Sequence, residues 1–128
     1  GTGILSIIAA RLGAQEVLGT DIDPVAVANS IENAQRNEVG HLFHANEELP
    51  EQRGAVHDVV VANILCQPLL ALASSIFAAM RPGAILYLSG LLQSQEKVIR
   101  ETYEPLGLTH VETRVQDDWI LIQFQRGY

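Results

Sequence analysis

The feature that most constrains the fold of this chain is its opening order of glycine loop, helix, strand and acid. Gly1-Thr2-Gly3 leads into a helix pattern over residues 5–12, and residues 16–20 follow as a strand. The strand ends at Asp21, about 18 residues after Gly3. In α/β domains this spacing places a carboxylate against a ribose. The order therefore predicts an α/β fold with a site for an adenosine-containing ligand.

The glycine loop itself reads as the tail of a longer one. Gly1, Thr2 and Gly3 stand at the very start of the chain, with no strand pattern before them. We therefore expect the strand that precedes such a loop, and the loop's first glycine, to be absent from this chain.

Two helix patterns occupy the first third of the chain. The first places Leu5, Ile8 and Leu12 on one face, and Gly13 stands where a C-cap belongs. Asp23-Pro24 predicts the start of the second helix, because Asp23 can cap it and proline fits its first position. The second helix runs to about Asn37, and its expected core face consists of Val27, Ile31 and Ala34.

Strand and helix patterns continue to alternate through the rest of the chain. Strands are predicted at residues 42–44, 59–62, 84–89, 108–115 and 119–125, and helices over residues 69–80 and 91–104. The unbroken β-branched run at 59–62 is typical of a strand covered on both faces. Residues 45–55 hold several acids, a proline and a glycine, which predicts a solvated loop.

The last two strands fix the end of the sheet. Only the turn at Asp117-Asp118 separates them, so they pair antiparallel, because a parallel return needs a dozen residues or more. The predicted fold is thus a doubly wound, mostly parallel α/β sheet with an antiparallel C-terminal hairpin. We expect it to form one domain over residues 1–128.

Composition excludes several classes of function. The chain is 48% hydrophobic without a continuous apolar run long enough to span a membrane. Eight Lys and Arg against fifteen Asp and Glu give a net charge of −7, which disfavours nucleic acid as a partner. Cys66 is the single cysteine, which fits a reducing cytoplasm. We expect no metal site, because the histidines lack ligand spacing; they are His41, His44, His57 and His110.

Four segments and the hairpin ending carry a resemblance to a known family. They are Gly19–Pro24, Glu32–Asn37, Val60–Leu65 with the nearby Pro68-Leu69, and Leu88–Leu92. In this order they resemble the catalytic domain of the bacterial ribosomal protein L11 methyltransferases (PrmA), which are class I S-adenosylmethionine-dependent enzymes. The likeness runs from end to end of the chain.

The resemblance implies a cofactor, a substrate and a set of site residues. S-adenosylmethionine would be bound by Gly1, Thr2, Gly3, Asp21, Ile22 and Asn63, with Asp21 on the ribose and Ile22 over the adenine. Asn63 follows a strand at its carboxyl end, where open α/β sheets bind ligands. It is the expected catalytic residue, and would hold the incoming amine. The acceptors would be lysine side chains and the N-terminal amine of a ribosomal protein in the cytoplasm.

In that family arrangement the absent first strand lies between the strand ending at Thr20 and the strand ending at Ala62. Two inner strand edges are then left open, and such edges recruit a partner. We therefore expect the chain by itself to bind S-adenosylmethionine poorly and to associate with copies of itself or to rearrange its sheet.

Two other functions stay open on the residues alone. Gly1, Gly3 and Asp21 by themselves also suit a nicotinamide-dependent oxidoreductase domain, although the catalytic Tyr-x-x-x-Lys pattern is absent. A non-catalytic binding fragment is the other alternative. Among the site residues, Ile22 could instead be a core residue. Asp23 is interpreted as a structural helix cap and Cys66 as a packed side chain.

Overall fold

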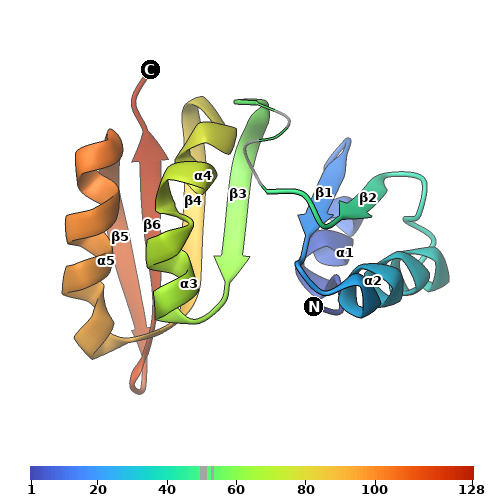
Figure 1. Cartoon of the computed structure of the whole chain (residues 1–128), viewed down its shortest axis with the longest axis horizontal. Coiled ribbons are helices and arrows are strands. Elements are labelled where there is room, and N and C mark those ends of the chain that lie inside the picture. The colour runs from blue at the N-terminus through green and yellow to red at the C-terminus, as the bar shows by residue number, and fades with distance from the viewer. Residues whose placement is uncertain (50–51, 53) are drawn as a thin grey trace. The chain divides into compact units, whose positions relative to one another are not determined.

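The computed structural model describes residues 1–49, 52 and 54–128, which form two compact units, Gly1–Leu49 and Pro50–Tyr128 (Figure 1). Pro50 and Glu51 of the predicted solvated loop lie outside the described residues. Among the described residues, no helix is long and apolar enough to cross a membrane. Each unit has its own hydrophobic core.

The first unit is a short parallel pair of strands with two helices. Its elements are α1 (Ile4–Arg11), β1 (Val17–Thr20), α2 (Pro24–Arg36) and β2 (Phe43–Asn46). β1 and β2 run parallel, with Val17 opposite Phe43 and Thr20 opposite Asn46. Because the pair is parallel, both carboxyl ends lie at the same edge of this small sheet. The core of the unit consists of Ala10, Ala34, Val39 and Phe43.

The α2 helix begins as the sequence predicts. The Asp23 side chain accepts a hydrogen bond of 2.9 Å from the Val25 N–H, and Pro24 occupies the first turn. On the core face Ala34 is fully buried, but Ser30 takes the buried place expected for Ile31, which is exposed. Ser30 is small enough to lie against the backbone of the opening loop.

The α1 helix ends at the predicted position, where Gly13 adopts the left-handed conformation. Its apolar face is open, however. Leu5, Ile8 and Leu12 are all exposed, and the buried side chain of this helix is Ala10.

The second unit is a four-stranded mixed sheet with helices. Its strands are β3 (His57–Asn63), β4 (Met80–Leu92), β5 (Leu108–Gln116) and β6 (Trp119–Arg126). Its helices are α3 (Cys66–Ala71), α4 (Ala73–Ala79) and α5 (Glu96–Tyr103), with short 3₁₀ turns η2 (Gln93–Gln95) and η3 (Glu104–Leu106). The strand order is β3-β4-β6-β5, parallel at β3–β4 and antiparallel elsewhere. This confirms the predicted α/β fold with its antiparallel C-terminal hairpin.

Two predicted boundaries are wrong because strand pairing extends β4. The strand begins at Met80, whereas residue 84 was predicted, and it keeps Leu91 and Leu92, which were assigned to the next helix. Leu91 lies opposite Ile120 and Leu92 opposite Trp119, so the hairpin strand fixes both residues in the sheet. The helix predicted over residues 69–80 is divided at Leu72 into α3 and α4.

The helices of the second unit lie on one face of its sheet. Figure 1 shows α3, α4 and α5 on the same side, in front of the strands. Val60 and Ala62 pack toward the core on that side, whereas Val59 and Val61 are 54% and 48% exposed. The prediction that residues 59–62 are covered on both faces is therefore wrong within this unit, because its own helices cover only one.

Two side chains close the core of the second unit. The buried Tyr103 hydroxyl donates to the Leu69 carbonyl at 2.7 Å, near the division between α3 and α4. Burial raises the pKa of Tyr103. Arg126 stacks its guanidinium 4.2 Å from the centre of the Phe77 ring. It also donates to the carbonyls of Phe77 and Met80 at the end of α4, where the helix dipole favours a cation.

Candidate functional site

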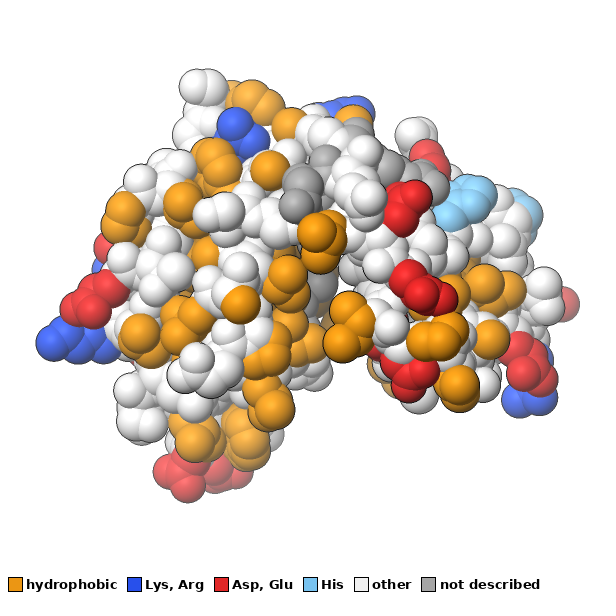
Figure 2. Space-filling model, viewed as in Figure 1, with side chains coloured by type: hydrophobic (Ala, Val, Ile, Leu, Met, Phe, Trp, Pro, Cys, Tyr) orange, Lys and Arg blue, Asp and Glu red, His pale blue; other side chains and the backbone are white. Residues whose placement is uncertain are grey.

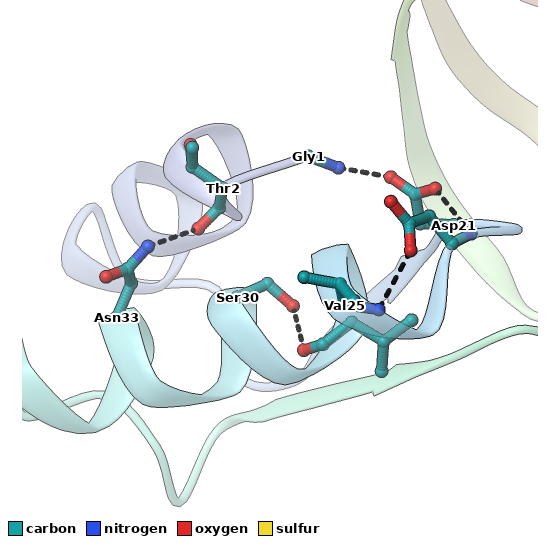
Figure 3. A network of polar contacts seen from close by, with 8 residues as sticks. Gly1, Thr2, Asp21, Val25, Ser30 and Asn33 are labelled. Atoms are coloured by element: carbon teal, nitrogen blue, oxygen red, sulfur yellow. Dashed lines mark hydrogen bonds and ion pairs between the residues drawn. The ribbon is translucent and has the colours of Figure 1, made fainter.

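The opening loop and the acid after β1 are in contact. Figure 3 shows the Gly1 nitrogen donating to the Asp21 carboxylate, whose Oδ1 also accepts the Asp23 N–H at 3.0 Å. The Asp21 side chain is 28% exposed and lies at the carboxyl end of β1. The two features that the sequence spacing linked are thus brought together in space.

The electrostatics of Asp21 keep it charged. In this 128-residue chain, the N-terminal ammonium of Gly1, and then the Asp23 N–H, hold the pKa of Asp21 below its ordinary value. Each carboxylate oxygen can accept two hydrogen bonds. Since each oxygen accepts one from these partners, acceptor capacity remains on both for hydroxyl donors such as those of a ribose.

The α2 helix holds the loop in place, through two residues that the sequence reasoning did not assign to the site. Asn33 donates its side-chain N–H to the Thr2 carbonyl at 3.0 Å. Gly3 has a φ of 83°, and a Cβ there would lie 2.9 Å from the Ser30 Cβ. Asn33 belongs to the segment Glu32–Asn37 that carried the family resemblance. The sequence therefore marked this residue, but did not show that it holds the glycine loop.

Ile22 lies in solvent beside the acid. It is 89% exposed, so its reading as a core residue is wrong. An exposed isoleucine next to a charged carboxylate is a pairing suited to a ligand with an apolar ring and polar hydroxyls.

Asn63 ends β3 in the second unit and lies against Gly90. It stands opposite Ser89 on β4, at the carboxyl edge of this parallel pair. Gly90 has a φ of 78°, and a Cβ at this position would lie 2.5 Å from Asn63 Oδ1 and 3.2 Å from the Ile64 carbonyl oxygen. The missing side chain of Gly90 therefore makes room for the Asn63 amide. Gly90 belongs to another segment of the resemblance, Leu88–Leu92, but had no assigned role.

The predicted site residues thus fall into two groups. Gly1, Thr2, Gly3, Asp21 and Ile22 belong to the first unit, and Asn63 belongs to the second. Within residues 1–49, 52 and 54–128, no three His, Cys, Asp or Glu side chains gather as a metal site would need.

The chain is similar to ribosomal protein L11 methyltransferases in both sequence and structure. The model of the family described as ribosomal protein L11 methyltransferase (PrmA) matches residues 1–127. The L11 methyltransferase of Hahella chejuensis is 40% identical over 98% of this chain and 42% of its own length. That of Chromohalobacter salexigens is 43% identical over 95% of this chain and 41% of its own.

A solved structure agrees with these relatives. The crystal structure of the ribosomal protein L11 methylase from Lactobacillus delbrueckii subsp. bulgaricus superposes with a TM-score of 0.92, at 26% identity. It covers all of this chain, which spans 67% of that structure and about two fifths of the curated relatives. The nicotinamide-dependent oxidoreductase alternative is not favoured by these matches. With the fold, the glycine loop at Asp21 and the family match over residues 1–127 together, the chain belongs to the ribosomal protein L11 methyltransferase (PrmA) family.

Proposed function

We propose that this chain carries the methyl-transfer site of an S-adenosylmethionine-dependent protein methyltransferase. The proposed acceptors are lysine side chains and the N-terminal amine of ribosomal protein L11, which the relatives' names give as the substrate. A ribosomal substrate also supports a cytoplasmic location. The observation that carries the proposal is the contact between the glycine loop and Asp21 in a chain of this family.

The residues of the first unit fit S-adenosylmethionine. Asp21 would accept the ribose hydroxyls, because both of its oxygens retain acceptor capacity. The exposed Ile22 would cover the adenine ring, and Gly1, Thr2 and Gly3 would lie along the amino-acid part. When bound, this cofactor supplies an electrophilic methyl group on a sulfonium.

The acceptor amine needs help from the second unit. A lysine with a pKa near 10.4 is neutral in only about one molecule in a thousand at physiological pH, and only the neutral amine attacks. Partial desolvation would favour the neutral amine. The carbonyl groups of Asn63 and of the following loop would accept its remaining N–H groups and aim its lone pair. Positioning would then supply most of the rate enhancement.

Substitution of Asn63 tests this assignment. In the longest protein that carries this chain, we expect Asn63→Ala to lower turnover at least tenfold while the Kd for S-adenosylmethionine changes by less than threefold. The reason is that Asn63 holds the amine in this proposal. Asn29→Ala is the matched control, because Asn29 is an exposed residue of α2.

Turnover is measured as S-adenosylhomocysteine formed with L11, and affinity by calorimetry. Turnover of Asn63→Ala within about twofold of wild type, which is under 0.5 kcal/mol of barrier, would mean that Asn63 is structural only. A thermal-shift comparison of S-adenosylhomocysteine with NAD separates methyltransferase from oxidoreductase. Stabilisation by neither would favour the non-catalytic binding fragment.

We also propose that the chain by itself associates through open strand edges. Among the described residues, β1 pairs only with β2, and β3 pairs only with β4. Unpaired edges of this kind template further pairing.

A further inference from the structure

A second group of exposed side chains lies near Asn63, at the end of the sheet where β3 and β4 terminate. Figure 1 shows that the turn between β5 and β6 lies at this same end. Across this edge, Leu92 at the end of β4 is paired with Trp119 at the start of β6. Leu91 and Ile120 are buried under the helices, so their neighbours Leu92 and Trp119 face the opposite side of the sheet.

Asn63 shares that side of the sheet. Val60 and Ala62 point toward the helices, so Val59, Val61 and Asn63 point away from them by the alternation of a strand. Asn63, Leu92 and Trp119 therefore lie on one face at one edge.

A hollow of about 340 Å³ adjoins this edge, lined by Leu92, Gln93, Ser94 and Asp118. The Gln93 N–H donates to the Asp118 carbonyl at 3.0 Å, which joins the two sides of the hollow. Its lining combines one apolar side chain, two neutral polar ones and one carboxylate. Trp119, 55% exposed, and Leu92, 38% exposed, continue the apolar surface. Figure 2, which shows the helix-covered side, has hydrophobic and acidic side chains gathered at the lower end of this unit.

From this arrangement we infer that the hollow beside Trp119 is a docking subsite for a basic side chain of the methyl-accepting segment. The inference rests on the proposed function, and it adds a second point of recognition beside Asn63. The Leu92 side chain fits the aliphatic stem of a lysine or arginine, and the Asp118 carboxylate fits its charge. The face of an exposed tryptophan attracts a cation as well.

Charge and spacing both support a basic partner. Asp117 and Asp118 are adjacent and exposed, in a chain of net charge −7. The strand order places β6 two strand spacings from β3, about 10 Å. Asn63 lies opposite Ser89, whereas Trp119 lies opposite Leu92, so Trp119 is also about 7 to 10 Å further along the strands. An extended peptide covers the combined distance of about 12 to 14 Å in about four residues. The preferred segment therefore carries its basic residue about four positions from the acceptor lysine.

Trp119 provides a direct readout, because it is the single tryptophan of the chain. The probe is a synthetic ten-residue peptide with an acceptor lysine and an arginine four positions away. A second peptide has glutamine in place of the arginine. Peptide binding is followed by Trp119 fluorescence without S-adenosylmethionine, and by anisotropy of the labelled peptide. We expect the arginine peptide to bind saturably, with a change in Trp119 emission, and at least fivefold more tightly than the glutamine peptide.

Substitutions at the hollow complete the test. Asp118→Asn and Leu92→Ala should each weaken anisotropy-measured binding at least fivefold, and Asp118→Asn should reduce its salt dependence. Glu101→Gln on α5 and Val111→Ala on β5 are matched controls with exposed side chains, and their peptide affinity should stay within twofold of wild type.

Equal binding of the two peptides, or equal effects of Leu92→Ala and Val111→Ala, would overturn the inference. This test measures peptide binding only. If the peptide binds as expected but methyl transfer to L11 fails in a separate assay, the proposed function is contradicted and the docking subsite is not.

Discussion

At the scale of single residues, Asp21 links the sequence to the ligand. Its carboxylate is charged at neutral pH, because even an unshifted aspartate has a pKa of about 3.9, and it can accept charge-assisted hydrogen bonds. In the longest protein that carries this chain, we expect Asp21→Ala to weaken S-adenosylmethionine binding at least tenfold, since hydrogen bonds to a charged group contribute about 1.5 to 3 kcal/mol each. Calorimetry measures the affinity. Asp58→Ala is the control, because Asp58 is an exposed acid in an ion pair with Arg81. An unchanged affinity in Asp21→Ala would remove the ribose assignment.

Gly90 is the residue on which the position of Asn63 depends. A methyl group at Gly90 would meet Asn63 Oδ1 at 2.5 Å, and its positive φ adds strain. We expect Gly90→Ala to lower turnover at least tenfold with little change in S-adenosylmethionine affinity, as for Asn63→Ala. The control is Gly127→Ala, where a Cβ would meet nothing within 4 Å. If turnover of the double variant Asn63→Ala, Gly90→Ala falls by the product of the two single fold-losses, Gly90 acts independently of Asn63.

Sequence could locate these residues but not all of their contacts. The order of loop, helix, strand and acid is a recurring one in α/β domains, so the contact between loop and acid was predictable. The close approach of Gly90 to Asn63 joins two strands, and only their register brings the residues together. Ser30 and Asn33 likewise act on a loop some thirty positions earlier, a distance that helix periodicity does not reveal.

At the scale of elements, the sequence predicted each helix and strand type better than its ends. The Asp23-Pro24 start of α2 was predictable because capping is a local interaction. The ends of β4 were not, because its last residues are held by pairing with β6, far along the chain. The exposed side of Val59 and Val61 was missed for a similar reason, since an apolar run does not tell which of its faces a helix covers.

A buried hydrogen bond joins α5 to α3 near the division between α3 and α4. Tyr103→Phe would leave the Leu69 carbonyl without the Tyr103 hydroxyl inside the core, which costs about 1 to 3 kcal/mol of unfolding free energy. Urea unfolding followed by circular dichroism measures the loss. Tyr87→Phe is the matched control on β4, where Tyr87 is only half-buried, and we expect a change below about 0.5 kcal/mol. Equal stability of the two variants would show that the Leu69 carbonyl needs no donor from Tyr103.

At the scale of the whole molecule, the open strand edges differ in how well they can pair. β1 has only four residues, and β5 carries charged side chains and a register shift between His110 and Glu112, features that blunt an edge. β3 has seven residues in parallel pairing with β4 alone, and its Val59 and Val61 are exposed. Of these edges, β3 is the one best able to recruit another strand.

We therefore expect the 128-residue chain by itself to sediment as a dimer or larger assembly at tens of micromolar, through β3. Val61→Lys should shift it to monomer, because a lysine on an edge strand opposes pairing with a second copy. Val111→Lys, the same substitution on the edge strand β5, should leave the assembly unchanged. Analytical ultracentrifugation over a concentration series measures both variants beside the wild-type chain. A wild-type chain that stays monomeric throughout, or two variants that dissociate equally, would mean that β3 does not act as a pairing edge.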